Sequence, residues 1–112
     1  MENHSVKKVI LTLLCLVSFQ VHAWDANGKV KITKLIAQNS PGLFIIETEP
    51  STIGNTSCTY HVKPRWDASA VLSKEMYSMA LVASAANKPI NIYIDGCVSN
   101  YPKIERMELL VD

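Results

Sequence analysis

Few side chains in this sequence could carry out catalysis or bind a metal. Once an N-terminal leader is set aside, the chain keeps one histidine, His61, and two cysteines, Cys58 and Cys97. One imidazole without a free thiol does not make an ordinary transition-metal site. A serine nucleophile would need His61 as its base and an acidic residue to orient that base, and no acidic residue neighbours His61 in the sequence. We therefore predict no catalytic residue, no metal site and no cofactor, with His61 facing outward from a strand.

Carboxylates are the remaining candidates for catalysis. Asp95 could approach Glu105 or Glu108 across neighbouring strands, and a pair of carboxylates is the arrangement that glycosidases use. Solvated surface charges are the favoured interpretation. The sequence also lacks a glycine-rich phosphate loop, so the chain is predicted not to be an enzyme.

Aromatic side chains favour binding over catalysis. Tyr93, Trp66, Tyr101 and Tyr60 could form a surface that stacks on sugar rings or apolar ligands, because aromatic faces supply contact area at little entropic cost. Tyr93 is the strongest surface candidate, since its isoleucine neighbours must point inward. For Trp66 the favoured interpretation is a core position beneath the start of a helix.

The two cysteines predict a disulfide. Cys58 and Cys97 are an even pair in a small chain that carries an export signal, which is typical of a structural bridge. Closing a loop of that length stabilises a fold by about 4 kcal/mol in the chain-entropy treatment. Two free thiols or a metal site are the alternative.

Residues 1–23 have the organisation of a secretory signal peptide. Lys7 and Lys8 precede an apolar run that is too short to span a membrane, and cleavage is expected between Ala23 and Trp24. This predicts a periplasmic or secreted protein in which residues 24–112 form a single domain. Nine basic and nine acidic residues remain after cleavage, which argues against nucleic-acid binding and against attachment to anionic lipid.

One helix is expected, from Asp67 to Lys88. Asp67 would cap its first turn, and Asn87 followed by Pro89 would end it. An inward stripe is predicted at helical spacing, formed by Leu72, Met76, Met79, Ala83 and Ala86. On the other face lie Tyr77, Leu81 and Ala85, which are either scattered surface residues or a face that packs on a second copy or a partner.

Strands are expected on both sides of this helix. The predicted strands are residues 29–36 with a β-bulge at 34–36, then 43–48, 58–63, 90–95 and 104–111. In the fourth, the three isoleucines Ile90, Ile92 and Ile94 should face inward. Three strands, a helix and two strands is the order of a mainly-β, five-stranded, OB-like Greek-key barrel.

The chain also resembles small exported bacterial proteins with OB-type folds. The matching features are Trp24, the GKV-x-I that starts at Gly28, the segment NKPINIYIDGC that ends at Cys97, and the closing KIERMEL. The block from Met76 to Cys97 is similar to the helix–strand segment in receptor-binding B subunits of the subtilase-cytotoxin and typhoid-toxin type. That resemblance implies binding of sialylated glycans and a ring of subunits whose helices line a pore. It assigns no sugar-contacting residue here.

Three functions are therefore expected, in order of preference. The first is a non-enzymatic exported binding domain for a glycan or an envelope partner. The second is a homo-oligomeric, receptor-binding protein like the toxin B subunits. The third is a periplasmic protein without a small-molecule ligand.

Overall fold

The computed structural model describes residues 26–111, and of Ala26 and Asn27 it describes the backbone alone. The elements are β1 (Ala26–Asn39), β2 (Gly42–Glu49), β3 (Arg65–Asp67), α2 (Ser73–Ala85), β4 (Ile90–Val98) and β5 (Tyr101–Leu109). The prediction of a mainly-β domain with five strands and one helix between the third and fourth is confirmed. The predicted signal peptide and the cleavage site at Ala23 and Trp24 lie outside the described residues. Within residues 26–111, no helix has the length and apolar character needed to cross a membrane.

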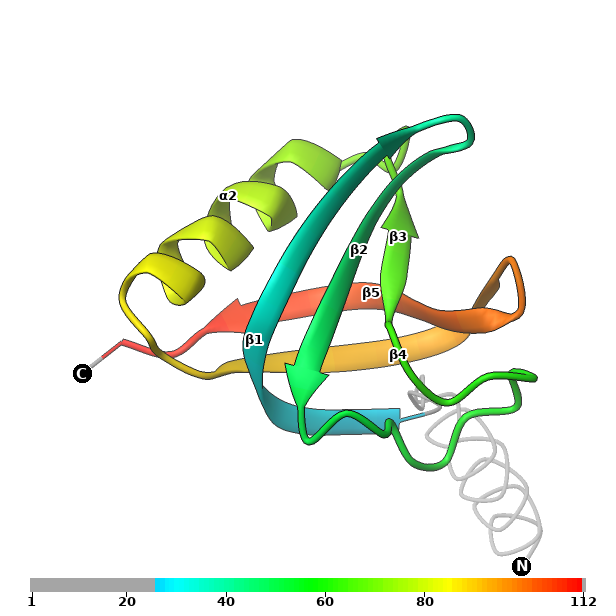
Figure 1. The fold of residues 1–112 in the computed structure, drawn as a ribbon, viewed down its shortest axis with the longest axis horizontal. Helices are drawn as coiled ribbons and strands as arrows, with labels where there is room; N and C mark the ends of the chain where they lie inside the picture. Colours follow the sequence, from blue (N-terminus) through cyan, green and yellow to red (C-terminus); the bar gives the residue numbers. More distant parts are fainter. Residues whose placement is uncertain (1–25, 112) are drawn as a thin grey trace, which may run out of the picture.

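The five strands close into a ring in the order β1-β2-β3-β5-β4 (Figure 1). The first part of β1 pairs with β4 and the later part pairs with β2, so one long strand belongs to both halves of the ring. Neighbouring strands are antiparallel except β3 and β5, which pair in parallel through Arg65 and Lys103. The contact between β3 and β5 is therefore the narrowest junction of the ring.

β1 bends where it passes from one half of the ring to the other. Its register with β2 shifts between Ile32 and Lys34, which leaves Thr33 as an extra residue. A bulge of this kind bends a strand and increases its twist. The bulge predicted at residues 34–36 therefore lies at Thr33 instead, and residues 34–36 pair regularly with β2.

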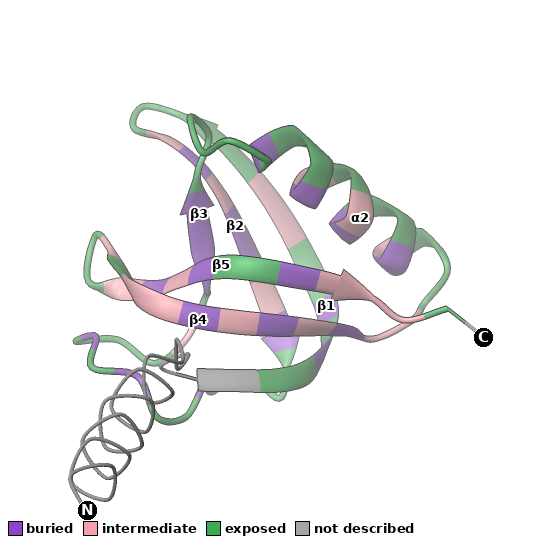
Figure 2. Cartoon of the chain, turned by 180° about the vertical axis from the view of Figure 1, so that it is seen from behind, coloured by how far each residue is buried: buried purple, intermediate pink, exposed green. Residues whose placement is uncertain are grey.

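The core lies between the ring and the inner face of α2 (Figure 2). In β4 the isoleucines at positions 90, 92 and 94 are buried, as predicted, and they alternate with half-buried polar residues. The helix contributes Met76, Ala80 and Ala83, whose small or flexible side chains let it lie close to β1 and β5.

The predicted third strand at residues 58–63 is wrong. This segment is an irregular loop whose backbone bonds to other loops: the Tyr60 N–H donates to the Asn100 carbonyl, and the His61 carbonyl accepts from the Ile53 N–H. Lys63 has a φ of 52°, which an extended strand cannot contain. The third strand follows instead as the short β3.

The predicted start of the helix at Asp67 is also wrong. Asp67 is the last residue of β3, and turns over the next five residues lead to the first helical residue, Ser73. Leu72 stands at the N-cap position without a side-chain cap, and its side chain is exposed rather than part of the inward stripe. Ala86, the other end of that stripe, is exposed as well.

The C-terminus of the helix follows the prediction more closely. Asn87 adopts the left-handed conformation, with a φ of 54°. The Asn87 N–H donates to the Ser84 carbonyl and the Lys88 N–H donates to the Ala83 carbonyl. These two bonds form a Schellman motif, which satisfies carbonyls that the end of a helix leaves free.

Candidate functional site

Cys58 and Cys97 form the predicted disulfide. Their sulfur atoms are 2.00 Å apart and their Cα atoms 5.7 Å apart, within the range of natural bridges. Cys97 lies in β4 and is exposed, whereas Cys58 is buried in the loop that precedes β3. The bridge therefore fastens this loop to the end of β4, beside the turn into β5.

Two of the four predicted ligand aromatics meet at this end of the ring. The rings of Tyr60 and Tyr101 stack with their centroids 4.7 Å apart and their planes 25° apart. The guanidinium carbon of Arg65 lies 3.6 Å from the centroid of Tyr101. We call Tyr60, Tyr101 and Arg65 the aromatic platform. Tyr60 is its exposed member, with 48% of its surface accessible to solvent.

Backbone contacts hold the platform in place. The Tyr60 N–H donates to the Asn100 carbonyl at 3.0 Å, and the disulfide lies two residues before Tyr60. Ser99 and Asn100 both have positive φ, as a two-residue type I′ hairpin turn requires. This tight turn delivers Tyr101 to the first position of β5.

Arg65 is the buried, charged member of the platform. Its Nε donates to the Lys63 carbonyl at 3.2 Å. Burial lowers the pKa of the guanidinium, and the neighbouring Tyr101 opposes that shift. An arginine remains protonated under such conditions, so the platform carries a permanent positive charge behind its rings.

Trp66 does not belong to the aromatic platform. Only 1% of its surface is exposed, and its ring packs on Phe44 with a centroid separation of 5.4 Å. Its indole N–H donates to Ser73, to the carbonyl at 3.2 Å and to the hydroxyl at 3.1 Å. The core position favoured from the sequence is confirmed, because β3 turns this side chain toward the start of α2.

Tyr93 lies in a separate polar network on the outer faces of β4 and β5. Its hydroxyl donates to the Glu108 carboxylate at 3.1 Å, and the same carboxylate accepts from Asn91 at 3.3 Å and from Arg106 at 2.9 Å. The bond from Arg106, followed by that from Asn91, holds the pKa of Glu108 below its ordinary value. Tyr93 is half-buried and is not one of the platform residues.

Both glutamates that the sequence analysis weighed as carboxylate partners of Asp95 are engaged by a cation. Glu105 forms an ion pair with Lys103 at 2.8 Å, and Glu108 is held by Arg106, so the two glutamates belong to different pairs. His61 is exposed. Among residues 26–111, no cluster of three or more histidine, cysteine or acidic side chains could hold a metal ion.

The predicted outward face of the helix is only partly outward. Tyr77 is half-buried, and its ring lies 4.6 Å from that of Phe44, so it packs on its own domain. Leu81 and Ala85 are exposed, as is Val82, which the sequence analysis did not single out. The face available to a partner is therefore the strip around Leu81 and Val82.

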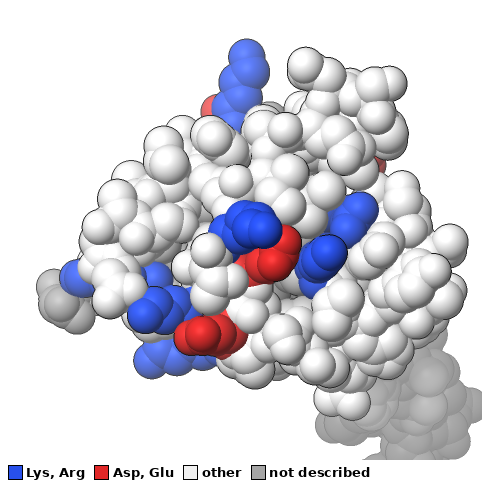
Figure 3. All heavy atoms as spheres, in the orientation of Figure 1, with Lys and Arg blue, Asp and Glu red and all other residues white. Residues whose placement is uncertain are grey.

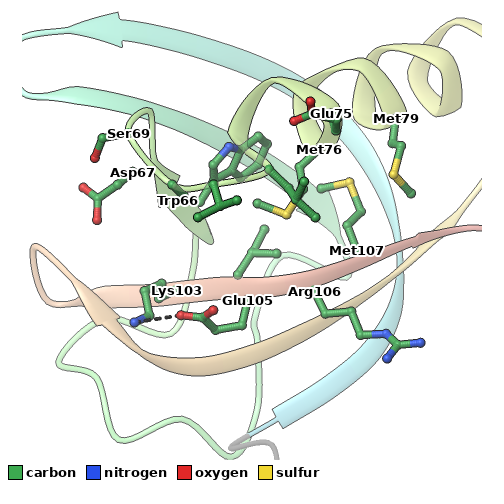
Figure 4. A pocket seen from close by; sticks show the side chains of 14 residues that line it. Trp66, Asp67, Ser69, Glu75, Met76, Met79, Lys103, Glu105, Arg106 and Met107 are labelled. Carbon is green, nitrogen blue, oxygen red and sulfur yellow. Dashed lines mark ion pairs between the residues drawn. The ribbon is translucent and has the colours of Figure 1, made fainter.

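Sequence reasoning missed a groove of about 520 Å³ beside α2 (Figure 4). It lies between β5 and the start of the helix with its preceding loop, and we call it the β5 groove. Its apolar lining includes Trp66 and three methionines, Met76, Met79 and Met107. At its rim stand Val71 and Leu72, whose surfaces are 96% and 60% exposed. The adjacent apolar residues Val71 and Leu72 could have indicated this groove in the sequence. They did not, because a helix starting at Asp67 placed Leu72 in the inward stripe.

Comparison with protein-family models found no matching family, and comparison with curated proteins and with solved structures found no match.

Proposed function

We propose that the chain is a non-enzymatic binding domain of the OB type and that its aromatic platform contacts a sugar ring. The ring order β1-β2-β3-β5-β4 supports the OB assignment, together with the parallel pairing of β3 and β5 and the helix between β3 and β4. OB folds bind oligosaccharides and oligonucleotides on the face of their second and third strands and on the loops that follow the first and fourth strands. The platform lies at the second of these loops, since Tyr101 directly follows the β4–β5 turn.

The observation that carries this proposal is the stacked pair of Tyr60 and Tyr101. A half-exposed tyrosine that rests on a second aromatic ring presents a fixed face to a ligand. Because the disulfide and the bond to Asn100 already order this face, binding would immobilise few additional groups. A sugar is favoured over nucleic acid, since acidic and basic side chains lie next to one another on the face that Figure 3 shows and form no continuous basic field.

A glycan array probed with residues 24–112 tests the proposal. We expect binding to a limited set of glycans, at least about tenfold weaker for Tyr60→Ala, because truncating an aromatic residue at the centre of a binding surface commonly costs about 2 kcal/mol. His61→Ala is the matched control, since His61 is the exposed neighbour of Tyr60. An array without binding, or equal binding by both variants, would refute the proposal and leave the alternative of a domain without a small-molecule ligand.

The sequence also supports export to the periplasm or the outside of the cell. The leader favours this location, and the Cys58–Cys97 bridge is compatible with it, because disulfides persist in oxidising compartments. An envelope protein is therefore a second kind of partner for this domain.

A homo-oligomer like the toxin B subunits is the second candidate function. The exposed Leu81 and Val82 on the outer side of α2 favour it, because pairing two copies through this strip would remove their apolar surface from water. Sedimentation velocity of residues 24–112 should then show a concentration-dependent assembly that Leu81→Lys dissociates. A monomer at the highest soluble concentration would exclude it.

A further inference from the structure

Within the described part of the chain, one edge of β5 has no strand partner over most of its length. β5 pairs with β4 along one side from Tyr101 to Leu109, whereas β3 meets its other side only where Arg65 faces Lys103. β3 ends two residues later, at Asp67. Among residues 26–111 no further strand pairs with that edge. An unpaired edge presents backbone N–H and C=O groups in a row and can template an additional strand.

The β5 groove runs along this free edge. Its lining includes five consecutive residues of β5, from Lys103 to Met107, and it faces the loop at residues 69–72 and the first turns of α2 on the other side. In Figure 4 the side chains of Met76, Met79 and Met107 lie between the helix and β5. The free strand edge and the apolar lining therefore belong to one elongated site.

β5 carries a bulge in the stretch that lines this groove. The register of β5 with β4 passes from Ile94–Ile104 to Tyr93–Arg106, so Glu105 is an extra, bulged residue. Glu105 and Arg106 are consequently both exposed, while Ile104 and Met107 on either side are buried. On β5 the groove lining therefore has two solvent-exposed charged side chains, with the buried Ile104 and Met107 on either side of them.

The lining suits apolar side chains of varied shape. Methionine is unbranched, flexible and polarisable, and it is frequent at surfaces that accept several partners. Val71 and Leu72 add an exposed apolar rim, although turns between a strand and a helix are ordinarily polar. Such a rim suits a partner that presents apolar side chains to it.

Charge in the groove favours a cationic partner. The hydrogen bond to Glu105 raises the pKa of Lys103, and the charges of Asp95 and Asp67 act in the same direction. Two of these carboxylates, Asp67 and Glu105, line the groove together with Lys103.

The helical side of the groove is acidic as well. Glu75 lies in the first turn of α2, and the other cation of the lining, Arg106, is engaged by Glu108 at 2.9 Å. The charges of the groove are thus complementary to a lysine, an arginine or a free amino terminus.

We propose that the β5 groove binds an extended segment of a partner protein, which adds to the free edge of β5 as a strand. Alternate side chains of that segment contact the methionines and the Val71–Leu72 rim, and a basic residue lies near Asp67 and Glu105. A strand is the fitting occupant, because the backbone groups of a helix are already bonded within the helix and cannot satisfy the edge of β5. Successive side chains of a strand also point to opposite sides, so every second side chain of the bound segment would contact the groove.

A random dodecapeptide phage library panned on immobilised residues 24–112 tests the proposal. We expect enriched peptides with apolar residues at alternate positions and at least one lysine or arginine. Their synthetic versions should bind at least about tenfold more weakly to the double variant Val71→Asp/Leu72→Asp. The matched control is Leu81→Asp/Val82→Asp, which changes exposed apolar residues outside the groove and should bind normally.

Hydrogen exchange identifies the mode of binding. A bound peptide should slow the exchange of amides of β5 between Ile104 and Leu109, and the Tyr60→Ala variant should bind it unchanged, which separates this site from the aromatic platform. The proposal is overturned if panning enriches no sequence or if enriched peptides bind the two double variants equally. Self-association of residues 24–112 that Val71→Asp/Leu72→Asp abolishes would also overturn it, because the occupant would then be a second copy.

Discussion

The guanidinium carbon of Arg65 lies 3.6 Å from the ring centroid of Tyr101. Arg65 is also the β3 residue that faces Lys103 in the parallel pairing with β5. Arg65 therefore takes part both in the strand pairing that closes the ring and in the aromatic platform. Any change at Arg65 should affect both the stability of the fold and the position of Tyr101.

Replacing Arg65 with lysine tests this double role. Lysine keeps the positive charge but loses the planar group that lies against the ring, and a desolvated cation–π contact is worth about 2 kcal/mol. We expect Arg65→Lys to lower the free energy of unfolding by about 1–2 kcal/mol in urea and to weaken glycan binding. Arg106→Lys is the control, since Arg106 is exposed and lies 5.4 Å from the ring of Tyr93. Equal unfolding energies for the two variants would contradict the role given to Arg65.

Removing the disulfide should cost more than any surface substitution. Cys58 and Cys97 are 39 positions apart, and the bridge constrains a loop of that size in the unfolded chain. The double variant Cys58→Ser/Cys97→Ser should lose about 4 kcal/mol of unfolding free energy, measured by urea denaturation. Dithiothreitol should lower the stability of the wild type toward that of the variant and leave the variant unchanged. A variant within 1 kcal/mol of the wild type would show that the bridge does not restrain the unfolded state as described.

The strands with clear alternation were the predictable part of the fold. Ile90, Ile92 and Ile94 recur at every second position, and such a pattern places one face inward whatever its partners are. The same holds for Val30 and Ile32. The Cys58–Cys97 pair was predictable for a different reason, because only two cysteines follow the predicted leader and they allow a single pairing.

The region between β2 and the helix could not be read from local pattern. Cys58, Tyr60 and Val62 alternate like a strand, but a left-handed Lys63 and contacts with the β4–β5 turn hold the segment as a loop. These contacts come from residues distant in the sequence. Asp67 has a side chain suited to a helix cap. Its neighbour Trp66, however, is held in the core by hydrogen bonds to Ser73, and Asp67 therefore belongs to β3.

The two candidate sites also differ in how far the sequence predicted them. Tyr60 and Tyr101 were named from residue type alone, but their stacking depends on the disulfide and the hairpin turn. The β5 groove was missed because it results from the shortness of β3, which leaves the edge of β5 open. The length of a short strand such as β3 is set by its pairing with distant strands, and the amino-acid pattern of the segment does not reveal it.

The contact between Trp66 and Ser73 should anchor the start of α2. Trp66→Phe removes the indole donor and leaves space in a buried site, so we expect a loss of about 2 kcal/mol in the free energy of unfolding. Ser73→Ala should cost less, about 1 kcal/mol, because the indole N–H still reaches the carbonyl of residue 73. Hydrogen exchange should report earlier opening of the first turn of α2 in both variants. Exchange unchanged in that turn would mean that packing alone holds Trp66.

The pH dependence of stability should reflect Glu108. Because bonds from Arg106 and Asn91 lower its folded pKa, the ionised carboxylate stabilises the fold above the ordinary glutamate pKa, and that stabilisation is lost as the pH falls through the lowered folded value. Glu108→Gln should therefore be less stable than the wild type at neutral pH, and the difference should shrink on acidification. Carboxyl NMR titration should show the pKa of Glu108 rising in Arg106→Gln and unchanged in Lys103→Gln, since Lys103 pairs with Glu105 instead. A stability difference that stays constant from neutral pH to below the ordinary glutamate pKa would contradict this account of the network.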